Sequence, residues 1–205
     1  MSEYSQIQTY IKSIPENFKC VIKRFAEVLE SLGLDSKYFT TEQEWELLHT
    51  TWLGGDAEEQ LFHNDGDQLH IRPYVTGWTP EVRKELQDTW LEVSLLFLTV
   101  EIENRIGQLK DEHKSLIWAM MEKFSKEFTE SGVYFTNEAT DGRPWEALIC
   151  GENEDKWEFD AAILPENLSQ IYKDYPTEMF ININEKTTFV ARKAIWRSAP
   201  WLTID

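Results

Sequence analysis

Two of the four histidines, His63 and His70, lie on either side of an Asp65-Gly66 pair that is typical of a two-residue β-turn. In such a hairpin residue 63 faces residue 68, and His70 becomes its diagonal neighbour on the same sheet face. Diagonal pairs lie roughly 7–8 Å apart between Cα atoms, so two imidazoles could share a metal ion. A third ligand, Glu59 or a residue from elsewhere, would complete the site. This arrangement gives a hypothesis of a metal-assisted hydrolase; the alternative is two histidines that face solvent on a hairpin.

The sequence offers no other catalytic or cofactor motif. It contains no phosphate-binding glycine loop, no Gly-x-Ser-x-Gly, no His-Glu-x-x-His and no EF-hand loop. The only cysteines, Cys20 and Cys150, are far apart and fit no zinc, haem or redox spacing, which favours two reduced thiols. We therefore expect no cofactor and no catalytic residue, and a protein that is not an enzyme is favoured.

Charge is the strongest signal in the chain. Twenty Lys and Arg stand against 37 Asp and Glu, for a net charge of −17. Two segments, 35–70 and 138–160, hold most of this excess. If they share a face, their field would speed the encounter with a basic partner; the alternative is a solvated surface that only aids solubility. The candidate partner-binding residues are Asp56, Glu58, Glu59, Asp65, Asp67, Glu152, Glu154 and Asp155.

The same charge argues against nucleic acid as a direct ligand, because a phosphate backbone requires a basic surface. In composition alone, as a small, acidic, Trp-rich chain, the sequence resembles the bacterial immunity proteins that neutralise basic nuclease toxins. That resemblance implies an acidic inhibitor of a basic protein, and no motif supports it. The N-terminus lacks the pattern of a signal peptide, and the most apolar stretch, 95–100, is too short to cross a bilayer. We expect a cytoplasmic protein without membrane contact, in an oligomeric state that the sequence leaves open.

Length and composition are those of one globular domain, residues 1–205, with 41% hydrophobic and 28% charged residues. Apolar residues at three- and four-residue spacings predict helices, and caps such as Thr79-Pro80 and stops such as Gly33 mark their ends. The predicted helices cover residues 18–32, 41–52, 80–100 and 116–128. For the helix predicted over 80–100, the alternative is a central strand over 90–102.

Short apolar and aromatic segments separated by turn residues predict strands, mostly in the last third of the chain. A short helix interrupts them at 165–172. The predicted strands are 60–64 paired with 67–74, then 133–136, 145–150 and 156–163, and finally 179–184 paired with 187–195. Together these elements predict an α+β fold in which a helix-rich N-terminal two thirds packs on an antiparallel sheet formed mainly by the C-terminal third.

Overall fold

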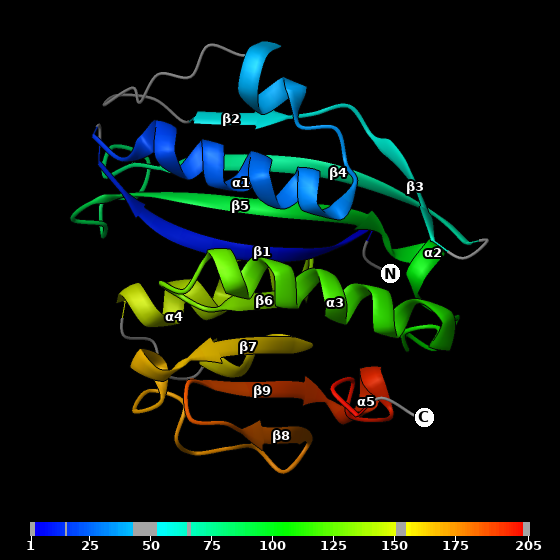
Figure 1. Cartoon of the computed structure of the whole chain (residues 1–205). Coiled ribbons are helices and arrows are strands. Elements are labelled where there is room, and N and C mark those ends of the chain that lie inside the picture. Colours follow the sequence, from blue (N-terminus) through cyan, green and yellow to red (C-terminus); the bar gives the residue numbers. More distant parts are fainter. Residues whose placement is uncertain (1–2, 15, 43–52, 65–66, 151–154, 203–205) are drawn as a thin grey trace.

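A single nine-stranded antiparallel sheet forms the body of the molecule (Figure 1). The computed structural model describes residues 3–14, 16–42, 53–64, 67–150 and 155–202. The strands follow the order β2-β4-β5-β1-β6-β7-β9-β8, and β3 pairs with β4 beside β2. Their bounds are β1 (Tyr4–Ser13), β2 (Leu53–Asp56), β3 (Gln60–Asn64), β4 (Asp67–Trp78), β5 (Thr89–Leu98), β6 (Val133–Asn137), β7 (Ala161–Pro165), β8 (Met179–Ile183) and β9 (Thr187–Arg192).

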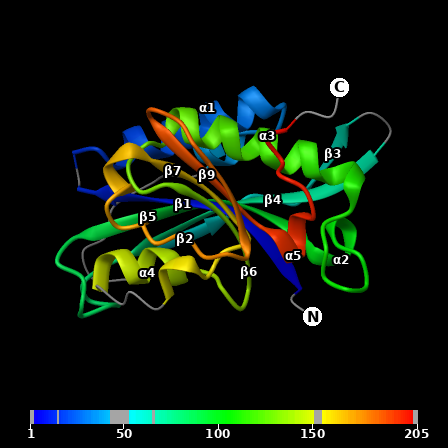
Figure 2. The same cartoon turned by 90° about the horizontal axis from the view of Figure 1, so that it is seen from below.

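Two long helices cover one face of this sheet, and a shorter helix lies on the other (Figure 2). The long helices are α1 (Phe18–Leu32) and α3 (Asp111–Glu127), and the helix on the opposite face is α4 (Arg143–Cys150). The remaining pieces are short: α2 (Thr99–Ile102), α5 (Lys193–Trp196), the π-helix η1 (Tyr38–Glu42) and the 3-10 turns η2 (Asp155–Trp157) and η3 (Glu166–Leu168). In the described ranges, no helix combines the length and apolar character that a membrane crossing demands.

The main core lies between the sheet and the pair α1 and α3. Phe25 of α1 and Phe124 of α3 meet with ring centroids 6.0 Å apart, and both are fully buried. Successive side chains of a strand point to opposite faces of the sheet, so β1 contributes side chains to both faces. Ile7 and Ile11 join this core, whereas Tyr10 packs with Trp145 of α4 in a separate cluster on the second face.

The prediction of a helix-rich N-terminal two thirds on a C-terminal sheet is wrong. Strands β1 to β5 all precede residue 99, and β1 lies between β5 and β6 at the middle of the sheet. The helix predicted over 80–100 is β5 and the turns that lead into it, so the central-strand alternative holds for Thr89–Leu98. Helices cover both faces of this strand, so apolar residues occupy nearly every position and match a helical period as well as a strand period.

Two other element predictions are wrong, and one strand was missed. Residues 145–150 belong to α4 rather than to a strand, and of the predicted strand 156–163 only residues 161–163 are extended, in β7. Strand β1 was not predicted at all. In contrast, several predictions are confirmed. The helix from Phe18 ends at Gly33, whose φ of 79° allows the left-handed conformation that stops a helix. The helix over 116–128, the strand at 133–136 and both predicted hairpins are also present. Residues 43–52 of the predicted second helix and the Asp65-Gly66 turn lie outside the described residues.

Candidate functional site

A carboxylate lies within the apolar run of the central strand β5. Glu92 is only 4% exposed and points to the second face, opposite to its neighbours Leu91 and Val93, which belong to the main core. The strand register places it between Tyr10 of β1 and Thr76 of β4. Trp78 of β4 donates from Nε1 to Glu92 Oε2 at 3.2 Å. The sheet thus fixes an acidic group where water scarcely reaches.

A second carboxylate, Asp141, approaches from the turn between β6 and α4. Although the residue lies on an exposed turn, its carboxylate accepts a hydrogen bond from Gln6 Nε2 of β1. The next residue, Gly142, has a φ of 72°, and a Cβ placed there would lie 3.8 Å from the Tyr10 hydroxyl. A Cβ would fit there in ordinary contact, so it is the positive φ, which L side chains rarely adopt, that favours glycine at this turn.

Gln8 of β1 connects the two acids. Its amide nitrogen faces Glu92 Oε1 at 3.1 Å and Asp141 Oδ1 at 2.8 Å, and its oxygen accepts from Thr136 Oγ1 at 2.8 Å. We assign this orientation because the opposite one would set the amide oxygen against acceptors only. We call the set Gln6, Gln8, Tyr10, Trp78, Glu92 and Asp141 the carboxylate cluster.

Burial and mutual repulsion change the acidity of both groups. Burial, then the negative charge of Asp141, raise the pKa of Glu92 to about 8, so Glu92 is mainly protonated at neutral pH. The pKa of Asp141 is also raised, first by burial and further by Glu146, although hydrogen bonds from Gln6, Gln8 and the Gly142 backbone oppose the rise. The Tyr10 hydroxyl, fully buried beside them, has a pKa well above its ordinary value.

Aromatic rings enclose one side of the carboxylate cluster. Tyr10 stacks on Trp145 of α4 with ring centroids 4.8 Å apart. Trp78 and Trp90 lie 6.3 Å and 6.0 Å from the Trp145 ring. Trp78 and Trp145 belong to this aromatic group, and Trp145 is 2% exposed.

Sequence reasoning missed the carboxylate cluster. A signal was present, because Glu92 is a lone acid in the apolar run 91–98 and Gln6 and Gln8 alternate with Ile7 and Thr9. Such alternation is typical of a strand with one polar face. What the sequence could not provide was the partner, since Asp141 lies far away in the chain and reaches Gln6 only through the β1–β6 pairing.

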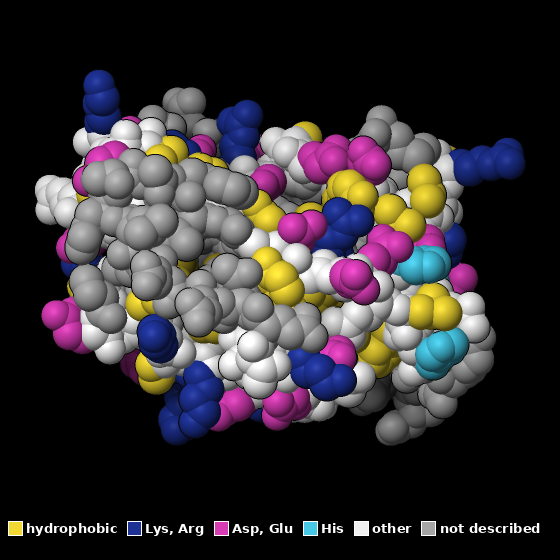
Figure 3. Space-filling view, turned by 90° about the horizontal axis from the view of Figure 1, so that it is seen from above, with side chains coloured by type: hydrophobic (Ala, Val, Ile, Leu, Met, Phe, Trp, Pro, Cys, Tyr) yellow, Lys and Arg dark blue, Asp and Glu magenta, His cyan; other side chains and the backbone are white. Residues whose placement is uncertain are grey.

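Three members of the predicted acidic face lie together at one edge of the sheet. Asp56 at the end of β2, with Glu58 and Glu59 before β3, are exposed, and we call these three residues the acidic edge. Arg72 of β4 reaches Asp56 and Glu59, each at 3.9 Å. Figure 3, which views the β2 side, shows Asp and Glu side chains gathered here with histidine beside them.

The second acidic segment does not join this edge within the described residues. Asp155 begins η2, which contacts α4 and lies across β1 from β2 (Figure 1). Asp67 begins β4. The other candidates, Asp65, Glu152 and Glu154, lie outside the described residues.

The two histidines of the metal hypothesis share a hairpin, as predicted. His63 pairs with Gln68 and His70 with Leu61, which puts both rings on one face. However, the His70 ring is held by Glu101 of α2, with Nδ1 and Oε1 2.5 Å apart, and Glu101 Oε2 accepts from the His70 backbone at 2.8 Å. Within the described ranges, no three His, Cys, Asp or Glu side chains are grouped so that they could hold a metal ion.

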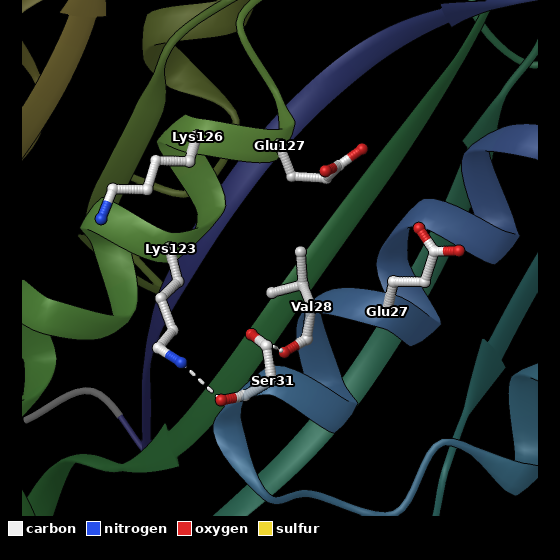
Figure 4. A pocket seen from close by; sticks show the side chains of 6 residues that line it. All are labelled: Glu27, Val28, Ser31, Lys123, Lys126 and Glu127. Carbon is white, nitrogen blue, oxygen red and sulfur yellow. Dashed lines mark hydrogen bonds between the residues drawn. The ribbon is translucent and has the colours of Figure 1, made fainter.

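A surface groove of about 320 Å³ lies between α1 and α3 (Figure 4). Its lining is mixed in charge, and Lys123 reaches across it to donate to the Ser31 carbonyl. Opposite charges in so shallow a groove select no ligand class. The residues that line it are Glu27, Val28, Ser31, Lys123, Lys126 and Glu127.

Comparison with known proteins gives no match. No family model, no curated protein and no solved structure is similar to this chain. Function must therefore be argued from the acidic edge and the carboxylate cluster themselves.

Proposed function

We propose that this chain is a non-enzymatic, cytoplasmic binding protein that holds a basic protein partner against its acidic edge. An immunity or inhibitor role towards a basic nuclease toxin is the concrete form of this function. The observation that carries the proposal is the exposure of Asp56, Glu58 and Glu59 together at one edge of the sheet, in a chain of net charge −17. Arg72 is the one basic side chain ion-paired with this edge among the described residues.

The edge also offers backbone groups. β2 and β3 both pair with β4, and no further strand among the described residues pairs with the outer side of β3. Leu61 of β3 is 44% exposed, so an apolar side chain lies next to the acids. An extended basic segment could add to such a strand by main-chain hydrogen bonds while the carboxylates select its charge.

The test is affinity capture from a lysate of the source organism with the wild-type chain and two variants. Glu58→Lys/Glu59→Lys reverses the acidic edge. Glu178→Lys/Glu185→Lys makes the same change in net charge at exposed positions near β8. We expect the wild type and the β8-side control to capture the same basic protein at about 50 mM salt and to release it at about 500 mM, where screening is strong.

The acidic-edge variant should fail to capture that protein at either salt concentration. If it captures the same proteins as the wild type, the acidic edge is not the binding surface and the charge serves solubility only. A catalytic activity of the captured protein that the wild-type chain suppresses and the edge variant does not would establish the inhibitor role.

A further inference from the structure

The sheet ends, on the side away from the acidic edge, in a strand without charge. β8 is the last strand in the sheet order and pairs with β9 alone among the described strands (Figure 1). Natural proteins protect a sheet edge with lysine, proline, an inward-pointing charge or a bulge. β8 has none of these, since its residues are Met, Phe, Ile, Asn and Ile and each pairs with one residue of β9. An edge of this kind favours pairing with a further strand.

The hydrogen bonds of the β8–β9 hairpin define which backbone groups of β8 face outward. The Asn184 N–H donates to the Thr187 carbonyl at 2.9 Å, which closes the hairpin. Alternate residues of an antiparallel strand bond to the same neighbour, so the even-numbered residues of β8 bond to β9. The N–H and C=O groups of Ile181 and Ile183 therefore point away from the sheet, where a further strand could pair with them.

Apolar side chains continue out to this edge. Met179 is buried in a core cluster with Tyr134 and Val190, and Ile181 packs against that cluster. Ile183 is the next residue on the same face of the strand, and its side chain is 62% exposed. The core beneath β9 thus ends on an uncovered isoleucine, and a strand placed beside β8 would remove this apolar surface from water.

The charges around β8 favour a second copy of the chain as that partner. Glu178 and Glu185 are matched by Lys186 and Lys193, and all four are exposed, so this edge is neutral in a chain of net charge −17. A basic protein gains no attraction from a neutral edge. Two copies, in contrast, can meet here without the repulsion that their acidic surfaces impose elsewhere.

Antiparallel pairing also brings opposite charges together. In such a pair the start of one strand lies beside the end of the other. Glu178 precedes β8 and Lys186 lies in the turn that follows it. Two paired β8 strands would set Glu178 of one copy near Lys186 of the second copy, and two-fold symmetry repeats this contact at the other end.

From these observations we infer that β8 is the interface of a symmetric dimer of this chain. The two β8 strands pair antiparallel about a two-fold axis, with the outward backbone groups of Ile181 and Ile183 bonded across it. A two-fold contact uses the same surface on both copies, so the assembly closes at two. This inference goes beyond the proposed function, because it concerns the opposite end of the sheet and leaves both acidic edges free.

The dimer should be weak. A pair of five-residue strands buries less surface than the roughly 1,200–2,000 Å² of a stable interface. We therefore expect a dissociation constant of about 100 µM. At the few micromolar used for unfolding and capture experiments, the chain is then a monomer.

The test is sedimentation velocity of the full chain between about 10 µM and about 1 mM, a range that spans the expected dissociation constant. The wild type should move from the chain mass towards twice that mass and no further. Ile183→Asp should remain a monomer throughout, because its carboxylate would lie against apolar side chains of the second copy. Circular dichroism should show that this variant keeps the wild-type fold.

Leu61→Asp is the matched control. It makes the same change in charge at a side chain that is 44% exposed on β3, at the other end of the sheet. This variant should dimerise as the wild type does. Hydrogen exchange adds a local readout: residues 179–183 should exchange more slowly at the high concentration than at the low one, and Ile183→Asp should lack this difference.

Four results would overturn the inference. The first is a wild type that stays a monomer at the highest concentration, which would leave β8 to a different partner or to none. The second is dimerisation of Ile183→Asp as strong as that of the wild type. The third is loss of the dimer in Leu61→Asp, which would place the interface at the acidic edge. The fourth is growth of the wild type beyond two copies, which would indicate pairing of β8 with the opposite edge of the next copy.

Discussion

Tyr10 of β1 and Trp145 of α4 stack face to face, with ring centroids 4.8 Å apart and planes 8° from parallel. This contact holds α4 on the second face of the sheet, against β1. It also places the turn that carries Asp141 above Gln6. The geometry of the carboxylate cluster therefore depends on a hydrophobic contact.

Replacement of Trp145 by alanine should remove that contact. We expect Trp145→Ala to lower the free energy of unfolding by about 3 to 5 kcal/mol, because a large ring that is 2% exposed leaves a cavity. Urea unfolding followed by circular dichroism measures the loss. Ile183→Ala, at a side chain that is 62% exposed, is the control and should change stability by less than about 0.5 kcal/mol. A loss below about 1 kcal/mol for Trp145→Ala would mean that α4 is not held by this ring.

Glu92 should make stability depend on pH. Its folded pKa of about 8 lies above the ordinary value of 4.5, so between these values the native state binds a proton that the unfolded state has released. Stability from this group is complete at low pH and falls as pH rises towards 8, by up to about 1.4 kcal/mol per pH unit. Glu92→Gln lacks this loss, so its stability relative to the wild type should increase from pH 5 to pH 8.

Urea unfolding of both proteins across that range is the measurement. Burial raises the pKa of Asp160 to about 6, so Asp160 also makes stability depend on pH. Because both proteins contain Asp160, its contribution cancels in the difference between them. A difference between the two proteins that stays constant with pH would show that Glu92 does not titrate in this window.

His70 should titrate above the ordinary histidine value of 6.5. The hydrogen bond to Glu101 and its negative charge are the main causes of the raised pKa, and Glu59 adds a smaller contribution. The pair stabilises the fold at low pH, and this contribution is lost as pH rises through the raised pKa. Nuclear magnetic resonance of the His70 ring should show a large fall in its pKa in Glu101→Gln and a smaller fall in Glu59→Gln. Equal falls in both variants would contradict the hydrogen bond to Glu101.

The acidic edge should contribute little to folding. Glu58→Lys/Glu59→Lys should change the free energy of unfolding by less than about 1 kcal/mol, because exposed charges are well solvated and surface ion pairs are weak. Thermal and urea unfolding, with Glu178→Lys/Glu185→Lys as the control of equal charge change, measure this. A large loss in the acidic-edge variant alone would give these acids a structural role and would explain any loss of partner binding without a direct contact.

Backbone amides of β5 should be among the slowest to exchange with solvent. β5 pairs with β1 on one side and β4 on the other, whereas β8 pairs with β9 alone among the described strands. Hydrogen exchange measured by mass spectrometry should therefore protect residues 89–98 more than residues 179–183. Equal protection of both segments, or faster exchange in 89–98, would contradict the central place of β5.

The sequence by itself determined the elements whose signals are local. Helix α1 ends at Gly33 because that residue takes a positive φ, and the β3–β4 hairpin keeps the register that an Asp-Gly turn predicts. Charge is also a property of the amino-acid composition alone, and it suffices to identify Asp56, Glu58 and Glu59 as candidate binding residues.

Only the tertiary structure decided whether residues 89–98 form a helix or a strand, because a segment buried on both faces has lost the periodicity that distinguishes them. The same holds for the carboxylate cluster. Glu92 and Asp141 belong to different parts of the chain, and residue type alone does not distinguish either from a surface acid. The pairing of β1 with both β5 and β6 brings them together. Strand pairing between residues distant in sequence buries Glu92 and brings the exposed turn of Asp141 against the same glutamine. Loss of solvation in this setting, rather than residue type, is the first cause of the raised pKa values of both acids.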